Sequence, residues 1–115
     1  MKVYLLCPVR QATEDERAFL DEHVASLERH GVTVHYPPRD APQDDPIGTE
    51  IVATHLKAIR ECDEVQLLWN PSSTGSHFDL GAAMVLDKPL RWLKAPERTA
   101  HKSYANVILA KGSQA

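Results

Sequence analysis

Small and hydroxyl-bearing residues gather in one turn near the middle of the chain, and a carboxylate follows them. The turn residues are Ser72, Ser73, Thr74, Gly75 and Ser76. Free backbone N–H groups and the positive dipole end at the start of a helix attract anions. The turn therefore predicts an anion site beside Asp79, which falls in the first predicted helical turn, where the dipole favours an ionised carboxylate. The alternative is a plain turn in which a serine caps the helix.

Two apolar runs must position this turn. Residues 65–69 predict a buried strand, and residues 80–86 predict the helix that follows. An α/β fold binds its ligands at the carboxyl end of a strand and the start of the next helix. The first apolar run, residues 3–9, predicts a second buried strand with Arg10 at its carboxyl end. Arg10 and the turn are therefore expected to meet in one crevice.

Strand and helix patterns alternate along the whole chain. Thr13 and Glu16 fit a capping box that starts a helix ending at Gly31. The segments that follow are a strand at 32–36, a helix at 49–61, the strand at 65–69, the helix at 80–86 and a strand at 90–93. The pattern predicts an α/β, flavodoxin/Rossmann-like three-layer sandwich with a parallel sheet in the order 2-1-3-4. Residues 103–111 fit a helix better than a strand, which leaves a fifth strand open.

The sequence also predicts the character of one long loop and of the C-terminal end. Residues 37–48 form a polar loop with several acids, and this loop is either a functional lid or a solvated connection. The length of 115 residues predicts one domain over residues 1–111, followed by a frayed tail at 112–115.

Composition narrows the function classes. The formal net charge of −3 argues against a nucleic-acid polymer as partner. The sequence has neither an apolar run of membrane-spanning length nor a signal peptide, so we expect a cytoplasmic protein that binds no membrane. Cys7 and Cys62 lack CxxC spacing, so they predict buried reduced thiols rather than a metal site or a redox cofactor.

Several short motifs occur in a fixed order along the chain. They are Cys7-Pro8-Val9-Arg10, Cys62-Asp63-Glu64-Val65, Asp79-Leu80-Gly81-Ala82-Ala83 and Lys88-Pro89-Leu90. Together they resemble the nucleoside 2-deoxyribosyltransferase superfamily, and within it the branch of the (deoxy)nucleoside 5′-monophosphate N-glycosidases. The resemblance implies cleavage or transfer of an N-glycosidic bond in a nucleoside or nucleotide, no cofactor, and a homodimer or larger symmetric assembly.

The resemblance also implies roles for single residues. Asp79 matches the carboxylate that attacks the anomeric carbon, although the family acid is usually Glu. Ser73 lies six positions earlier, where the monophosphate hydrolases carry Ser and the deoxyribosyltransferases carry Asp. Arg10 matches an Arg on the phosphate side, and Ser103 falls where the neighbouring subunit supplies a Ser. His55 aligns with a second family Asp, and is either an acid-base partner or a residue of the helix core.

The remaining expected substrate contacts lie beside these residues. They are Pro8, Asn70, Thr74, Gly75, Ser76 and His77. His77 either orients Asp79 or faces solvent, and Tyr4 is assigned to strand packing with base stacking as the alternative. Three functions stay open: an N-glycosidase or deoxyribosyltransferase, a non-catalytic nucleotide-binding or sensing module, and hydrolysis of another nucleotide such as a dinucleotide cofactor.

Overall fold

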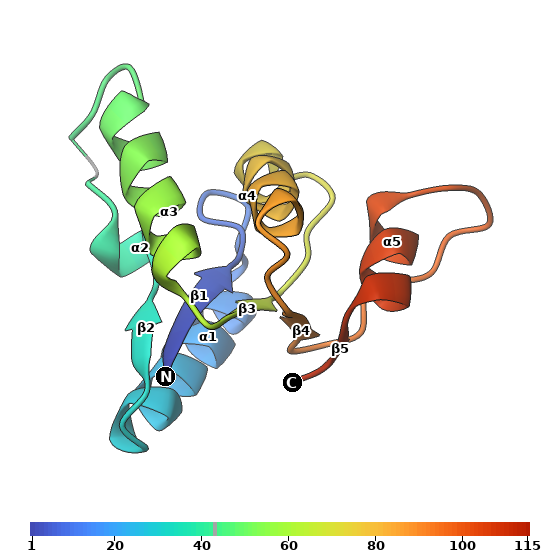
Figure 1. The fold of residues 1–115 in the computed structure, drawn as a ribbon, viewed down its shortest axis with the longest axis horizontal. Helices are drawn as coiled ribbons and strands as arrows, with labels where there is room; N and C mark the ends of the chain where they lie inside the picture. Colours follow the sequence, from blue (N-terminus) through green and yellow to red (C-terminus); the bar gives the residue numbers. More distant parts are fainter. Residues whose placement is uncertain (43) are drawn as a thin grey trace.

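Five parallel strands form one sheet in the computed structural model, which describes residues 1–42 and 44–115 (Figure 1). The strands are β1 (Lys2–Leu6), β2 (Thr33–His35), β3 (Glu64–Leu67), β4 (Leu90–Trp92) and β5 (Ser113–Gln114). Their order is β2-β1-β3-β4-β5, so the predicted order 2-1-3-4 is confirmed and a fifth strand is present. Because β1 pairs in parallel with β3, the carboxyl ends of these two strands lie side by side.

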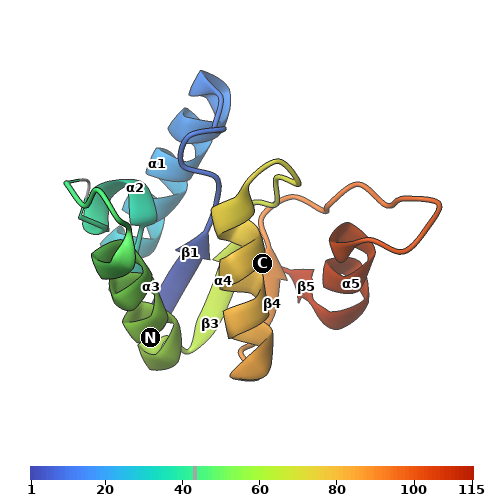
Figure 2. The ribbon, with the colours of Figure 1, turned by 90° about the horizontal axis from the view of Figure 1, so that it is seen from above.

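Helices cover both faces of the sheet (Figure 2). They are α1 (Glu14–Arg29), α2 (Pro37–Asp40), α3 (Thr49–Glu61), α4 (Thr74–Val85) and α5 (Tyr104–Lys111). On one face, Leu5 of β1 packs in a core with Leu20 of α1. On the other face, Tyr4 of β1 packs in a core with Ile59 of α3 and Leu80 of α4. This arrangement confirms the three-layer α/β fold.

Local capping signals fix two of these helices. The side chain of Thr13 accepts a hydrogen bond from the Glu16 N–H, and Glu16 accepts one from the Thr13 N–H, which is the predicted capping box of α1. The side chain of Ser103 accepts from the Asn106 N–H and caps α5. The preference for a helix at residues 103–111 is therefore confirmed.

Two element boundaries differ from the prediction. Helix α4 begins at Thr74, well before Leu80, because the Ser73 side chain accepts from the Ser76 N–H and caps the helix there. The loop predicted at residues 37–48 opens with the short helix α2, and its residue 43 lies outside the described residues.

The prediction of a frayed tail at residues 112–115 is wrong, because β5 pairs with the outer edge of β4 and Ala115 N–H donates to the Trp92 carbonyl at 2.9 Å. Gly112 permits this approach, since a Cβ at that position would lie 2.9 Å from the Leu90 carbonyl oxygen. Within residues 1–42 and 44–115, none of the helices has the length and apolar character that crossing a bilayer requires.

Candidate active site

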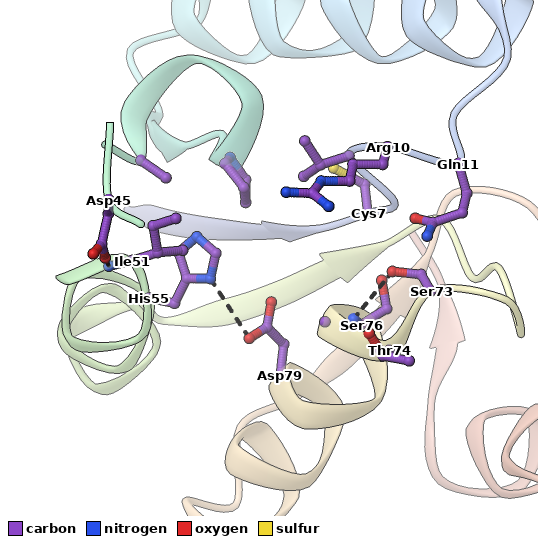
Figure 3. A pocket seen from close by; sticks show the side chains of 14 residues that line it. Cys7, Arg10, Gln11, Asp45, Ile51, His55, Ser73, Thr74, Ser76 and Asp79 are labelled. Atoms are coloured by element: carbon purple, nitrogen blue, oxygen red, sulfur yellow. Dashed lines mark hydrogen bonds and ion pairs between the residues drawn. The ribbon is translucent and has the colours of Figure 1, made fainter. Parts of the chain in front are cut away.

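A cleft of about 350 Å³ opens where β1 and β3 end and α3 and α4 begin (Figure 3). Its lining includes Arg10, His55 and Asp79 together with Ser73, Thr74, Gly75 and Ser76. Arg10 and Asp79 project toward the same space from opposite sides. The structure thus brings together side chains that lie far apart in the sequence, such as Arg10 and Asp79.

Asp79 is buried at the floor of this cleft, with 5% of its surface exposed. Its Oδ2 accepts a hydrogen bond from the Tyr4 hydroxyl at 2.7 Å, and its Oδ1 lies 3.8 Å from Nδ1 of His55. Tyr4 comes from β1, His55 from α3 and Asp79 from α4, so the carboxylate is held where three elements meet.

The charge state of Asp79 differs from the prediction. Asp79 is the sixth residue of α4 and lies in its second turn, where the field of the helix end is weak. Burial raises the pKa of Asp79 above its usual value, although the Tyr4 hydrogen bond and the charge of His55 act in the opposite direction. The expectation that the helix dipole favours the ionised form is therefore wrong, and Tyr4 and His55 are the groups that stabilise the anion.

The start of α4 offers polar groups to an anion. Ser76 is 2% exposed, and its Oγ has no hydrogen-bond partner among residues 1–42 and 44–115. Thr74 and Gly75 line the cleft at the same helix end. A buried hydroxyl without a protein partner is rare, and such a group is expected to form a hydrogen bond with a ligand or with water. This end of the cleft is therefore suited to a phosphate.

The start of α3 differs from that of α4, because the Asp45 carboxylate already accepts hydrogen bonds from its backbone N–H groups. Oδ2 of Asp45 accepts from the N–H groups of Glu50 and Ile51 at 2.8 and 3.0 Å. These and neighbouring backbone N–H groups, Ile51 foremost, hold the pKa of Asp45 below its usual value. At the start of α4, by contrast, the Ser73 side chain accepts from the Ser76 N–H, while the N–H groups of Thr74 and Gly75 have no partner among the described residues.

Four residues predicted to contact substrate do not line the cleft. Pro8 is fully buried beyond the end of β1. Asn70 shapes the turn, because its Oδ1 accepts from the Ser72 N–H at 2.9 Å. His77 lies outside the cleft, with its ring 4.8 Å from that of Trp69, and Ser103 caps α5. Contacts from these residues to substrate stay predictions.

Other lining residues were not predicted from the sequence. They are Cys7, Val9, Gln11, Pro37, Ala41, Asp45 and Ile51. Only Asp45 had a local signal, since an Asp shortly before a helix is a typical cap. Burial raises the pKa of the Cys7 thiol to about 12, so Cys7 lines the cleft as a neutral group. Among the described residues, no three His, Cys, Asp or Glu side chains are grouped as a metal site.

Two solved structures share this fold at low sequence identity. The 2-deoxyribosyltransferase of Bacillus psychrosaccharolyticus is 21% identical with a TM-score of 0.69, over 93% of this chain and 90% of that chain. The Clostridium botulinum CMP N-glycosidase BcmB is 22% identical with a TM-score of 0.65, over 98% of this chain and 83% of that chain. No curated protein matches the chain.

The sequence itself matches one family over nearly its whole length. The family described as Nucleoside 2-deoxyribosyltransferase matches residues 3–109. The matched range contains all the residues that line the cleft. The resemblance predicted from the short motifs is confirmed, and the chain belongs to the nucleoside 2-deoxyribosyltransferase family.

Proposed function

We propose that the protein cleaves the N-glycosidic bond of a nucleoside 5′-monophosphate, and that water or a second base then takes the sugar. The observation that carries this proposal is the placement of buried Asp79 in one cleft with the start of α4 and with the Ser76 hydroxyl, which has no partner among the described residues. Family membership supports the reaction class. The known reaction of BcmB on CMP, in a similar fold, supports a nucleotide substrate.

The spacing along α4 suits such a substrate. An α-helix rises about 1.5 Å per residue, so the four steps from Gly75 to Asp79 span about 6 Å along the axis. This length is comparable with the distance across a ribose from its 5′-phosphate to its anomeric carbon. A phosphate held by Gly75 and Ser76, with Arg10 opposite, therefore leaves the anomeric carbon close to Asp79.

The residues around Asp79 then have distinct roles in the reaction. Oδ1 of ionised Asp79 bonds to the anomeric carbon while the bond from that carbon to the base breaks. Tyr4 keeps its hydrogen bond to Oδ2 and so presents Oδ1 to the sugar. His55, 3.8 Å from Oδ1, is the acid-base partner that exchanges protons with the leaving base or the incoming water.

A second candidate function is a nucleotide-binding or sensing module without turnover. The observation in its favour is the raised pKa of Asp79, caused by burial, because protonation removes the nucleophile. Both candidates use the same phosphate end of the cleft. They differ only in whether a bound nucleotide loses its base.

The functional unit is proposed to be a homodimer. Phe78 and Val85 are 50% and 82% exposed and lie with Leu86 along a surface groove on α3 and α4. Gly81 and Ala82 in this groove are small enough to let a helix of a second copy approach closely. A two-fold pairing through this face covers the exposed apolar side chains. Ser103 is proposed to reach the partner's cleft.

The test is incubation with a panel of nucleosides and nucleoside monophosphates, followed by chromatography for free base. Release of base from at least one monophosphate, faster than from its nucleoside, is the expected result. Calorimetric binding of a monophosphate without any release would favour the sensing module. Neither binding nor release across the panel would contradict both candidates.

A further inference from the structure

Three aromatic rings pack together behind Asp79. Tyr4 of β1 and His35 of β2 are register partners in the parallel sheet, and their rings stack at 5.3 Å with an interplanar angle of 10°. The ring of His55 stands edge-on to both, 6.0 Å from Tyr4 and 5.7 Å from His35. Because Tyr4 and His55 also contact Asp79, the cluster links the carboxylate of α4 to β2.

Each histidine of this cluster has one buried ring nitrogen that lacks a hydrogen-bond partner among the described residues. Nε2 of His35 and Nε2 of His55 are both buried and make no hydrogen bond with any of the described residues. A buried polar atom without a partner destabilises the folded protein. The terminal torsion of a histidine side chain is soft, so two neighbouring rings can turn toward each other at a lower cost. No hydrogen bond joins the two nitrogens in this structure, so a direct contact between them requires one of the rings to turn.

The two histidines line different cavities. His55 lines the cleft that holds Asp79. His35 lines a second cavity of about 410 Å³, together with Thr33, Asp40 and Cys62. The two cavities share no lining residue among those described, so the contact between the histidine rings joins them.

We propose that His35 and His55 form a proton relay from the cleft to this second cavity. The relay rests on the proposed N-glycosidase function. When water attacks the anomeric carbon of the glycosyl ester, a carbon–oxygen bond forms, and the bond to Oδ1 breaks and returns its electron pair to Asp79. The proton of the water passes to Nδ1 of His55. The Nε2 proton of His55 passes to Nε2 of His35, and His35 releases its Nδ1 proton to the second cavity.

A relay is useful here because a bound nucleotide fills the cleft and separates His55 from bulk water. The charges around His35 favour onward transfer. Burial lowers the pKa of His35, the neighbouring His55 and Arg39 lower it further, and Asp40 opposes them. A neutral His35 is free to accept a proton and does not retain it.

The groups that face this pair come from four elements. His35 faces Tyr4 of β1, Arg39 and Asp40 of α2, and His55 of α3. His55 faces Asp79 of α4. Further charges around the second cavity are Lys2, Glu28 and Glu61. Asp40 is the acidic group that acts on the pKa of His35, but Arg39 and the Tyr36 N–H already hold its carboxylate, so the proton leaves His35 for solvent in the second cavity.

The test compares two replacements of His35 with a matched control. His35→Phe keeps a ring to stack on Tyr4 but has no nitrogen, and His35→Gln keeps a hydrogen-bonding nitrogen that cannot take up a proton. His30→Gln, at the exposed end of α1, is the control. Both His35 variants should lose about 10- to 100-fold in kcat at neutral pH, at the low end of acid-base contributions, with KM changed less than about twofold. Added imidazole buffer should raise the rate of His35→Phe in proportion to its concentration.

Several outcomes would overturn the relay. A wild-type rate and pH profile in His35→Phe, without buffer dependence, would show that no proton passes through His35. Full activity in His35→Gln with a defect only in His35→Phe would reduce His35 to a residue that positions His55. The control His30→Gln should match the wild type in both readouts.

A readout without turnover separates this proposal from the proposed function. In NMR titrations of the histidine rings, His55→Gln should raise the titration midpoint of His35, because the repulsion between the two imidazoles disappears. An unchanged midpoint would overturn the coupling that the relay requires, whether or not the protein releases base. If wild-type protein releases no base but the midpoint moves, the reaction is wrong and the coupled pair stands.

Discussion

The hydroxyl of Tyr4 donates a hydrogen bond of 2.7 Å to Oδ2 of Asp79, across 75 positions of sequence. Burial raises the pKa of Tyr4 far above its usual value, so the phenol stays protonated and remains a donor. One carboxylate oxygen is thereby fixed, and Oδ1 is left to face His55 and the cleft. The sheet, through β1, sets the orientation of a side chain that belongs to α4.

Asp79→Asn should abolish base release while leaving nucleotide binding intact. Asn has nearly the same shape but cannot attack the anomeric carbon, and the proposed phosphate contacts lie one turn earlier in α4. Chromatography measures release, and calorimetry measures binding. Asp87→Asn is the matched control, since Asp87 is exposed and has a φ of 53°, which Asn tolerates. Release by Asp79→Asn at the wild-type rate would remove Asp79 from the mechanism.

The same substitution should change how stability depends on pH. Burial raises the pKa of Asp79 in the folded protein above that of an exposed aspartate, so the native state binds this proton more tightly than the unfolded chain. The stabilisation is complete below about pH 4 and is lost as pH rises through the folded pKa. Urea unfolding should therefore show Asp79→Asn gaining free energy of unfolding relative to wild type as pH increases above 4. If the difference in free energy of unfolding between Asp79→Asn and wild type stays constant from about pH 4 to about pH 8, the raised pKa of Asp79 is contradicted.

Ser76→Ala should weaken binding of CMP but not of cytidine. The buried Ser76 hydroxyl has no partner within the described part of the chain, so its loss leaves no broken hydrogen bond and should cost little stability. A hydrogen bond to a charged phosphate contributes about 1.5–3 kcal/mol, so CMP affinity should fall roughly tenfold to a hundredfold. Ser72→Ala, exposed in the same turn, is the calorimetric control. Equal losses for CMP and cytidine would rule out a phosphate role for Ser76.

Ser73→Asp should reverse the preference for a monophosphate over its nucleoside. Ser73 is buried at the cap of α4, lines the cleft, and accepts a hydrogen bond from the Ser76 N–H through its Oγ. A carboxylate can still cap the helix there, but its charge repels a phosphate in a partly desolvated site. Calorimetric titration with CMP and cytidine checks the order of affinities. An unchanged preference for CMP would show that the phosphate does not bind at the start of α4.

Val85→Glu should convert the proposed dimer into a monomer of 12.8 kDa. Val85 is 82% exposed in the single chain, so a charge there should not disturb folding, but it would be buried in a pairing through α4. Light scattering at micromolar concentration measures the mass. Ile47→Glu, at an 86% exposed position before α3, is the control and should stay dimeric. A wild-type protein that is already monomeric would contradict the pairing.

The sequence alone determined the local elements and their order. The capping box at Thr13 and Glu16, the apolar runs and the strand-helix alternation are short-range signals, and each is decided by neighbours within a few residues. Parallel strands joined by helices leave few topologies, so the meeting of β1 and β3 also followed from the sequence. Arg10 and the serine-rich turn were predicted to share a crevice for this reason, and Arg10 lines the cleft together with residues 73–76 of the turn.

The tertiary structure decided what surrounds Asp79. No local pattern shows that Tyr4 and His35 stack beside His55, or that the last residues add β5 to the sheet. The raised pKa of Asp79 depends on burial between β1, α3 and α4, which are far apart in the chain. Desolvation and hydrogen bonding act through space at a few ångströms, so they are fixed only when the packing of distant elements is complete.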